Sequence, residues 1–306
     1  MNNNLIVLLG PTCSGKTDIA IKLALHFGCE IISADSRQFY SEMRIGTAVP
    51  SDDQMRLVRH HFIRFLPVDR YYSSSLFERD VLQLLPQLFT KHNLAILAGG
   101  SGMYIDAVCH GTDEIPDVEQ DIRDKYNVLY QQSGIEGLRQ ALKILDPEHY
   151  KKVDLRNYKR IIRALEICES TGRPYSSFLL KQRKERDFNI IKTGLRIDRE
   201  ELYERINRRV DDMILAGLEE EARGLLPVKD LNALNTVGYR ELFDYFEGKI
   251  SRDKAIELIK RNSRRYAKRQ MTWWSKDREI KWFSPDEIEK ITGYIQEKLS
   301  GEVLQP

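Results

Sequence analysis

Residues 5–27 read LIVLLGPTCSGKTDIAIKLALHF and decide the fold, because three kinds of segment follow one another in them. Residues 5–9 form a short apolar run that is typical of a buried strand. In residues 18–27 the apolar side chains of Ile19, Leu23 and Phe27 recur with helical spacing. Between them the chain matches GxxxxGK[ST], the phosphate-binding loop, in the strand-to-helix context that this motif requires. The loop consists of Gly10, Pro11, Thr12, Cys13, Ser14, Gly15, Lys16 and Thr17.

The composition of this loop predicts a di- or triphosphate ligand. Its glycines let backbone amides point at phosphate oxygens, and the start of the following helix adds partial positive charge. Lys16 supplies a point charge, and the hydroxyl of Thr17 is a ligand that Mg²⁺ accepts. The motif leaves open whether the phosphate is transferred, hydrolysed or released as a leaving group.

Two further strands are predicted to end beside this loop. Residues 30–34 (EIISA) and 94–98 (LAILA) are short apolar runs followed by polar or glycine-rich residues, and a helix is expected at 81–89 between them. This alternation predicts an α/β fold with a P-loop NTPase-like core and a central parallel sheet. Ligands of such sheets bind at the carboxyl ends of the strands. We therefore expect the active site where the three strands end.

The residues after these two strands are candidates for chemistry. Asp35 follows the second strand, and its carboxylate could hold Mg²⁺ indirectly or accept a proton as a general base. A helix N-cap or a turn would also explain an aspartate at this position. The segment GGSGMY, residues 99–104, places the hydroxyl of Ser101 after the third strand, although glycines there are often simple turn formers.

The middle of the chain has a different pattern from its two ends. Residues 113–189 are mostly charged segments of helical periodicity with turn signals, so we predict a helical insertion domain there. A strand-like run, IIKTGLRI at residues 190–197, marks the return to the core, and a long helix is expected from 251 to about 276. The expected domains are a P-loop core of residues 1–112 and 190–306 with a helical C-terminal part, and an insertion of residues 113–189.

The composition indicates a globular protein of 306 residues and 35.7 kDa, with a mean hydropathy of −0.47. No apolar run approaches the roughly 20 residues that cross a bilayer. The four dispersed cysteines lack metal-ligand spacing, which favours reduced thiols and a cytoplasmic location. The net charge is only +2, yet residues 249–281 hold twelve lysines and arginines against four acids. This basic segment is a candidate phosphate-binding surface.

Together the segments GPTCSGKT, SADSRQFY (residues 33–40) and GGSGMY resemble the tRNA dimethylallyltransferase family, also called the IPP transferase family, of bacterial type. The resemblance covers roughly residues 5–275, in order and with the spacing of the family. Its further motifs are IGTA at residues 45–48, HHF at 60–62, KRIIRALE at 159–166, TGRP at 171–174, VGYR at 237–240 and YAKRQMTW at 266–273.

This resemblance implies transfer of the dimethylallyl group from dimethylallyl diphosphate to the exocyclic amine of adenine 37 in tRNA, giving N6-dimethylallyladenosine and free diphosphate. It also implies Mg²⁺ as a cofactor and a phosphate loop that binds the prenyl diphosphate instead of ATP. Asp35 matches the base that holds and deprotonates the amine, Ser101 stands where the family usually has threonine, and Arg209 matches the arginine that reaches the diphosphate. The residues that match tRNA-contacting segments are Asp35, Ser36, Arg37, Gln38, Ser101, Arg123, Asn157, Tyr158, Lys159, Arg160, Ile161, Asn235, Thr236, Val237, Gly238, Tyr239 and Arg240.

Transfer to a base of the anticodon arm requires that base to leave the stack and enter the site. We expect the core and the insertion to clamp the arm, and the basic C-terminal helix to hold its backbone phosphates. In this helix Ile256, Ile259, Tyr266 and Trp273 have the spacing of an apolar seam, so Trp273 is expected in the core. The pair His60-His61 has no partners at ligand spacing, so we expect a structural or substrate-channel role and no metal.

The sequence also leaves three other functions to be considered. A small-molecule P-loop kinase or NTPase explains the phosphate loop but gives the basic segment no purpose. An adenylate isopentenyltransferase uses a free nucleotide and would not need the insertion. A non-catalytic RNA-binding protein is disfavoured by a phosphate loop aligned with a candidate base. The expected partners are therefore tRNA and dimethylallyl diphosphate, with no membrane, and the protein is expected to be a monomer.

Overall fold

The structure is a computed structural model that describes residues 3–113, 115–116, 118–180 and 183–301. The chain forms two compact units. The core unit consists of residues 1–110 and 185–306, and the helical unit consists of residues 111–184. In the described part of the chain, no helix is both long enough and apolar enough to cross a membrane.

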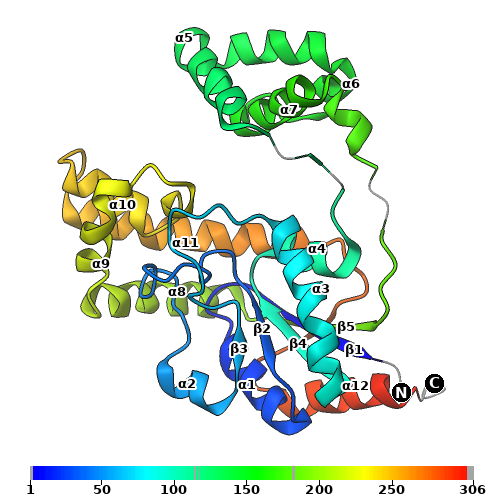
Figure 1. Cartoon of the computed structure of the whole chain (residues 1–306). Helices are drawn as coiled ribbons and strands as arrows, with labels where there is room; N and C mark the ends of the chain where they lie inside the picture. Colours follow the sequence, from blue (N-terminus) through cyan, green and yellow to red (C-terminus); the bar gives the residue numbers. More distant parts are fainter. Residues whose placement is uncertain (1–2, 114, 117, 181–182, 302–306) are drawn as a thin grey trace. The chain divides into compact units, whose positions relative to one another are not determined.

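The core unit contains a six-stranded sheet with helices on both faces (Figure 1). Its strands are β1 (Asn4–Leu9), β2 (Ile31–Ala34), β3 (His60–His61), β4 (Leu94–Gly99), β5 (Asn189–Leu195) and β6 (Lys281–Phe283). Its α-helices are α1 (Lys16–Phe27), α2 (Asp52–Leu57), α3 (Ser74–Lys91), α4 (Gly102–His110), α8 (Arg199–Leu215), α9 (Leu218–Leu225), α10 (Tyr239–Phe246), α11 (Arg252–Trp274) and α12 (Ile288–Ser300). Two 3-10 helices, η2 (Leu226–Val228) and η3 (Asn232–Leu234), complete it.

Neighbouring strands of the sheet are all parallel, in the order β3-β2-β4-β1-β5-β6. The predicted α/β core with a central parallel sheet is thereby confirmed. β1 lies inside the sheet, where Leu5 pairs with Ala95 of β4 and with Ile190 of β5. The sequence does not predict the edge strands β3 and β6, because two or three residues are too few to show a periodic pattern.

Alternate residues of β1 pack on opposite faces of the sheet, as the pleat of a strand requires. Leu5, Val7 and Leu9 belong to a core with residues of α3, α4, α10 and α11, whereas Ile6 and Leu8 pack with α1 and α12. All five side chains are almost completely buried. Burial of each such side chain contributes roughly 1.5–3 kcal/mol. The strand that leads into the phosphate loop is therefore firmly anchored.

The helical unit has a small core of its own. It contains α5 (Gln120–Leu145), α6 (Pro147–Lys152), α7 (Tyr158–Thr171) and the 3-10 helix η1 (Tyr175–Phe178). The backbone of α5 is non-helical at Gly134, where φ is 62°, a conformation that costs a glycine little. The fully or nearly buried residues of this core are Tyr126, Leu138, Leu142, Ile161, Ile162, Ala164 and Leu165.

The buried side of α11 differs from the seam that the sequence predicts. Ile259 is buried as expected, but Trp273 is 49% exposed and its neighbour Trp274 is buried. The expectation that Trp273 lies in the core is therefore wrong. Consecutive residues point about 100° apart on a helix, so a small error in the helix phase exchanges the two tryptophans. The Nε1 of Trp273 instead donates a hydrogen bond to Oδ2 of Asp106 at 2.8 Å.

β2 and β4 approach each other so closely at their carboxyl ends that Gly99 has no room for a side chain. A Cβ on Gly99 would lie 2.2 Å from the carbonyl oxygen of Ala34 and 2.5 Å from its carbonyl carbon. Both are backbone atoms of the neighbouring strand. A larger residue can therefore be accommodated only by moving the strands apart.

We predict that Gly99→Ala lowers the free energy of unfolding by about 1–3 kcal/mol, because overpacking forces the two strands apart. Gly293→Ala is the matched control, since an added Cβ on this glycine of α12 meets nothing within 4 Å. That variant should gain about 0.5–1 kcal/mol from the better helix propensity of alanine. Denaturant unfolding measures both changes. Equal stabilities of Gly99→Ala and the wild type would contradict the close approach of the strands.

Candidate active site

Three segments meet at the carboxyl ends of adjacent strands in the core unit (Figure 1). The phosphate loop, residues 10–17, follows β1, which lies next to β4 and then β2. Asp35 directly follows β2, and Ser101 lies two residues after the end of β4. The sheet thus gathers at one edge the three segments that the sequence analysis singles out.

The phosphate loop has a backbone and side chains suited to an anion. α1 begins at Lys16, and Gly15 before it has φ of 81°, in the left-handed region that favours glycine. The Oγ of Ser14 is buried and has no hydrogen-bond partner among the described residues. A buried hydroxyl without a partner is costly unless a ligand satisfies it. The loop therefore offers backbone amides, a helix start and one unsatisfied hydroxyl to a phosphate.

Lys16 and Arg209 bring positive charge to this loop. The Nζ of Lys16 donates a hydrogen bond to the carbonyl oxygen of Pro11 at 2.6 Å. Arg209, from α8, donates from Nη1 to Oγ1 of Thr12 at 3.3 Å. Burial lowers the pKa of Lys16 to about 8, against the influence of Asp35 and together with that of Arg209. An anionic ligand would offset both the energetic cost of burying these cations and the repulsion between them.

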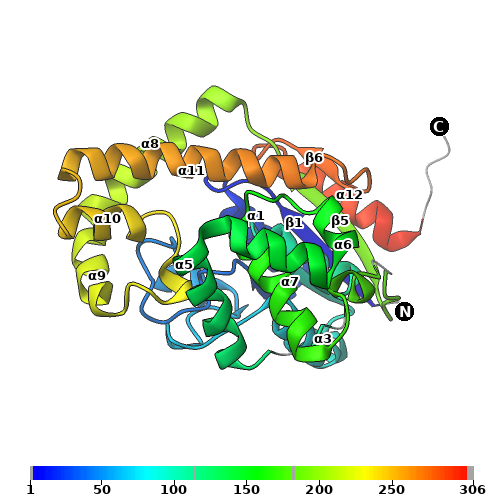
Figure 2. The ribbon, with the colours of Figure 1, turned by 90° about the horizontal axis from the view of Figure 1, so that it is seen from above.

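Two cavities meet beside Asp35. The phosphate cavity, of about 360 Å³, is lined by the phosphate loop and residues 47–50. The side cavity, of about 350 Å³, is lined by α8, α11 and most of residues 235–240. α8 and α11 are in contact: α8 runs beneath α11 in Figure 1 and passes behind it in Figure 2, which is seen from above. The residues that line both cavities are Thr12, Cys13, Asp35, Thr47, Arg209 and Tyr266.

Asp35 forms a turn and also faces both cavities. Its Oδ1 accepts a hydrogen bond from the N–H of Arg37 at 3.0 Å, so the turn role that the sequence allows is present. The Oγ of Ser101 accepts a hydrogen bond from the N–H of Ser36 at 3.0 Å and lies 3.2 Å from the Oγ of Ser36. These contacts tie the loop after β4 to the loop after β2. Ser101 therefore holds the residue that directly follows Asp35 in the chain.

Gln270 in α11 is a site residue that the sequence analysis does not single out. This side chain is nearly buried, and its Oε1 accepts a hydrogen bond from the N–H of Thr12 at 2.9 Å. Its Nε2 donates to the carbonyl oxygen of Gly100 at 2.7 Å. A Cβ on Gly100 would lie 2.4 Å from this Nε2, so the close approach requires glycine. The one sequence signal is an amide side chain inside the motif YAKRQMTW.

Tyr266, one turn before Gln270, is a second such residue. It lines both the phosphate cavity and the side cavity. Burial raises the pKa of Tyr266 to about 12, and the nearby Asp35 carboxylate acts in the same direction. The phenol is therefore neutral at physiological pH. The position that the sequence assigns to an apolar seam is thus occupied by a polar group of the site.

One carboxylate orders a loop that helps to enclose the two cavities. Glu221 of α9 accepts hydrogen bonds from the backbone N–H groups of residues 44–46 at 2.7–2.9 Å. It also accepts a hydrogen bond from the hydroxyl of Tyr239 at 2.7 Å. Thr47, which lines both cavities, follows directly. Sequence reasoning misses Glu221 because a glutamate in a run of acids is typical of a solvated helix face.

Two residues for which the sequence implies tRNA contact have no exposed surface. Tyr239 is fully buried, and its hydroxyl is bound to Glu221. Ile161 is fully buried in the core of the helical unit. The expectation of a direct contact is therefore wrong for both side chains, which pack instead. Tyr158, in the same helix as Ile161, stacks on Tyr130 with ring centroids 4.3 Å apart.

The other implied tRNA contacts lie on the surfaces of both units. In the core unit, Ser36 and Arg37 line the side cavity, and Gln38 lines the phosphate cavity. The residues of the segment 235–240 that line the side cavity are Asn235, Thr236, Val237, Gly238 and Arg240.

In the helical unit, Lys159 and Arg160 are exposed near the start of α7. Asn157 caps this helix, since its side chain accepts a hydrogen bond from the N–H of Arg160. The Nε of Arg123 donates to Oε1 of buried Glu166 at 3.0 Å, which gives Arg123 a structural role within the unit. A tRNA contact of these residues stays a prediction.

The histidine pair has partners of its own. The Nε2 of His61 lies 2.6 Å from Oε2 of Glu30, and the Nδ1 of His60 lies 2.8 Å from the carbonyl oxygen of Val58. His60 also lines a small cavity beside Lys16. These contacts are consistent with the structural or channel role that the sequence predicts.

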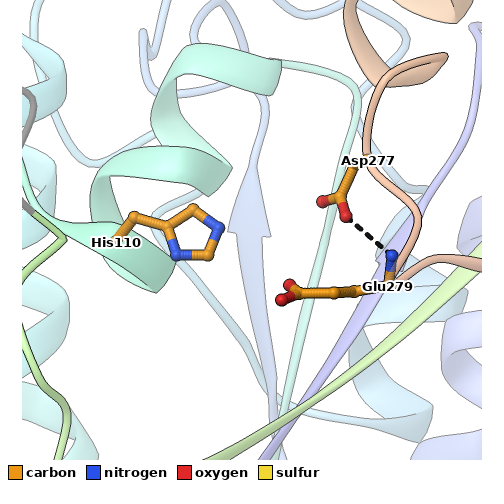
Figure 3. Close-up of side chains that lie close together, drawn as sticks. All are labelled: His110, Asp277 and Glu279. Carbon is orange, nitrogen blue, oxygen red and sulfur yellow. Dashed lines mark hydrogen bonds between the residues drawn. The ribbon is translucent and has the colours of Figure 1, made fainter.

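Three potential metal ligands, His110, Asp277 and Glu279, come together elsewhere in the core unit (Figure 3). The Nζ of Lys192 lies 3.0 Å from Nε2 of His110 and 2.7 Å from a carboxylate oxygen of each acid. Burial alone would lower the pKa of Lys192, but its hydrogen bonds to Asp277 and Glu279 raise the pKa above its ordinary value. The ammonium group of Lys192 therefore occupies the position that a metal ion would take among these three side chains.

Comparisons with known sequences agree with this geometry. The model of a family described as IPP transferase matches residues 38–277. The chain is 53% identical to a tRNA dimethylallyltransferase of Christiangramia forsetii, over 98% of this chain and 100% of that protein. It is 50% identical to tRNA dimethylallyltransferase 1 of Bacteroides fragilis, over 95% of this chain and 97% of that protein.

Solved structures have the same fold. A tRNA isopentenylpyrophosphate transferase from Bacillus halodurans has a TM-score of 0.73 and 34% identity, with 98% of both chains covered. A eukaryotic dimethylallyltransferase acting on tRNA has a TM-score of 0.84 at 22% identity, with 100% of this chain and 81% of that chain covered. The second likeness shows the fold alone.

We predict that Gln270 positions the phosphate loop through both ends of its amide. In Gln270→Glu an ionised carboxylate cannot donate to Gly100, and its charge repels an anion in the loop. The Kd for inorganic diphosphate should therefore rise roughly tenfold at about pH 8, the cost of about one such hydrogen bond. Burial at this position should raise the pKa of the introduced carboxyl above its ordinary value, and protonation restores a donor, so the ratio of variant to wild-type Kd should fall toward one as the pH is lowered through that pKa. Titration calorimetry measures this ratio.

The control for this prediction is Gln270→Met, which removes both hydrogen bonds without adding a charge. Its loss of diphosphate affinity, relative to the wild type, should be the same at every pH. A pH-independent ratio for Gln270→Glu would contradict the positioning role, because it would show that diphosphate affinity does not depend on a hydrogen-bond donor at this position. Denaturant unfolding of both variants verifies that they are folded.

Proposed function

The chain belongs to the IPP transferase family and transfers a dimethylallyl group to tRNA, and we propose that the donor is dimethylallyl diphosphate and the acceptor the exocyclic amine of adenine 37. One observation carries this proposal: Asp35 lines both the phosphate cavity and the side cavity. A carboxylate at this boundary can receive a proton from a nucleophile in one cavity that attacks a diphosphate ester in the other.

The phosphate cavity would hold the diphosphate of the donor. Loop amides, the Nζ of Lys16 and the guanidinium of Arg209 surround it, and the unsatisfied Oγ of Ser14 adds a hydrogen bond. When the bond between C1 of the prenyl group and oxygen breaks, its electron pair stays on the diphosphate. Cations and amides at fixed positions stabilise this additional charge. An arginine is well suited, because it can donate two parallel hydrogen bonds.

Mg²⁺ fits the oxygen-rich side of the phosphate cavity. Thr17 and Asp18 both line this cavity, and hydroxyl and carboxylate oxygens are ligands that Mg²⁺ prefers. We propose Thr17 as the residue that holds the ion together with the diphosphate. The bound ion would supply further neutralisation of the leaving group.

The side cavity would hold the adenine after it leaves the anticodon stack. The Asp35 carboxylate then accepts a hydrogen bond from the amine, and the Ser101 hydroxyl is held beside it through Ser36. The amine nitrogen forms a bond to C1 of the prenyl group as the C1–O bond breaks. The proton released from the amine passes to Asp35, so charge and atoms balance. Diphosphate is the second product.

The charges of α11 favour a polyanionic acceptor over a free nucleotide. Among the described residues, no ion pair is found for Arg265, Lys268 or Arg269, and Arg269 lines the side cavity. By contrast, Lys260 of the same helix is paired with Asp211 at 2.6 Å. Arg269 at the cavity is placed to meet a phosphate that flanks the base, and the exposed Arg265 and Lys268 of the same helix add positive charge for the RNA backbone.

We also propose a cytoplasmic location and a monomeric active form. The four cysteines, Cys13, Cys29, Cys109 and Cys168, are free thiols, which supports a reducing compartment. The residues to which the proposed mechanism assigns a role, Lys16, Asp35, Ser101 and Arg209, all belong to the core unit of the chain, which supports a site built within one subunit.

The proposal is tested by incubating the protein with Mg²⁺, dimethylallyl diphosphate and unmodified tRNA, followed by mass spectrometry of the nucleosides. The wild type should add one dimethylallyl group to adenine 37. Asp35→Asn keeps an oxygen for the turn with Arg37 but removes the base, so kcat should fall roughly 10²- to 10⁴-fold. Asp53→Asn is the control, because this exposed carboxylate of α2 pairs only with exposed Arg56 among the described residues, and its activity should be unchanged.

Full activity of Asp35→Asn would show that Asp35 is not the base. Prenylation of free AMP without prenylation of tRNA would instead favour an adenylate isopentenyltransferase. Loss of the γ-phosphate from ATP in the absence of tRNA would favour a kinase or NTPase.

A further inference from the structure

The helical unit contains a large cavity that the proposed chemistry does not use. It has a volume of about 520 Å³ and lies between α6, α7 and η1. Its polar walls carry the side chains of His149, Lys152, Arg160, Arg163 and Tyr175. All of these residues belong to residues 111–184, so the cavity is complete within this unit.

Three cationic side chains and one acidic side chain line this cavity. The one acid in its wall, Glu148, is bound to Lys152 at 2.6 Å. Arg163 lies 3.4 Å from Glu166, a carboxylate that it shares with Arg123. In the part of the helical unit that the structure describes, Arg160 has no ion pair. Arg160 is thus an available guanidinium at the cavity, and the fitting ligand is an anion.

The cavity also has an aromatic and an apolar surface. The rings of His149 and Tyr175 meet edge to face, with centroids 4.9 Å apart. Val153 and Leu179 add apolar wall. A ligand that matches both the charge and these surfaces is a flat aromatic ring joined to a phosphate, because such ligands stack on aromatic side chains while arginine and lysine bind the phosphate.

A buried carboxylate holds the walls of the cavity in place. Asp146, which is fully buried, accepts a hydrogen bond from the N–H of His149 at 2.9 Å. It also accepts hydrogen bonds from the N–H and the Oγ of Ser176 at 2.6 and 2.8 Å. Ser176 follows Tyr175, so one side chain fixes both the His149 wall and the Tyr175 wall. A cavity built in this way needs little reorganisation to bind a ligand.

We infer that this cavity binds one unstacked nucleotide of the tRNA, a nucleotide other than the target adenine. Tyr175 stacks on its base, and Arg160 and Lys152 bind its phosphate. The inference rests on the proposed function, which supplies an RNA substrate, and adds a second nucleotide-binding site in the other unit. A free nucleoside monophosphate has the same chemistry, so the experiments must separate these two sources.

The charge contribution is tested with two matched pairs of variants. Lys152→Ala and Arg160→Ala remove cations that line the cavity, whereas Lys151→Ala and Arg156→Ala remove exposed cations of the same unit outside it. The first two should weaken tRNA binding roughly fivefold to tenfold and reduce the slope of log K against log salt by about one. The two controls should change neither quantity by as much. Equal effects of lining and control variants would overturn the inference.

The base contact is tested with a double-mutant cycle. Tyr175→Leu removes the ring, and abasic substitution removes each anticodon-loop base of the tRNA in turn. If one base stacks on Tyr175, the two losses of affinity are not additive at that single position, and Tyr175→Phe retains wild-type affinity. Additive losses at every position would overturn the inference. Denaturant unfolding shows whether Tyr175→Leu is folded, and Tyr175→Phe keeps the ring in place for comparison.

The two sources of a nucleotide are separated by competition. Free AMP, GMP, CMP and UMP, each at millimolar concentration, should not displace tRNA or bind in a Tyr175-dependent way. Micromolar binding of a free nucleotide that depends on Tyr175, with tRNA affinity unaffected, would overturn the inference in favour of a small-molecule site. Complete absence of tRNA binding by the wild type would contradict the proposed function instead, so the two failures are distinguishable.

Discussion

The side-chain amide of Gln270 joins the loop after β1 to the loop after β4 with two hydrogen bonds, and the active site depends on this link. The phosphate loop is set on the edge of the sheet by β1, but its distance from the Ser101 segment is not determined by the strands alone. The bridge through Thr12 and Gly100 fixes that distance, and Ser101 in turn holds the turn after Asp35 through Ser36. Three loops are thereby connected by short hydrogen bonds, which would keep the leaving group and the base of the proposed reaction at a fixed distance from each other.

Electrostatics explains why this arrangement calls for an anion. The burial of Lys16 and its closeness to Arg209 lower the pKa of Lys16 to about 8, and the hydroxyl of Ser14 is left without a partner among the described residues. The diphosphate of the proposed donor is an anion that would satisfy all of these groups at once. Elsewhere in the core unit the reverse solution is found, since Lys192 is fully compensated by two carboxylates and a histidine. Lys192, whose role is structural, is thus paired with acids of the protein, whereas Lys16 and Arg209 lie where a bound anion would neutralise them.

Each unit uses one carboxylate to shape a cavity. In the core unit, Glu221 gathers the backbone amides of residues 44–46 and the hydroxyl of Tyr239. In the helical unit, Asp146 gathers the amides of His149 and Ser176. A carboxylate has four acceptor positions and no donor, so it can collect several backbone N–H groups that no secondary structure satisfies. Glu221 and Asp146 each order irregular backbone, and this backbone forms part of the wall of the side cavity in the core unit and of the cavity in the helical unit.

The sequence by itself determined the phosphate loop, the parallel α/β core and the candidate base, because these depend on local spacing and on the rule that strands end at one edge of a sheet. It could not determine β3 or β6, which are too short for a pattern, or choose between Trp273 and Trp274, because one residue changes the facing direction by about 100°. Only the tertiary structure decided the roles of Gln270, Glu221 and Asp146. Their partners lie up to 258 residues away, and a lone amide or carboxylate carries no sign of what the fold will bring to it. Hydrogen bonds of this kind depend on distance in space, and a linear pattern of residues does not encode that distance.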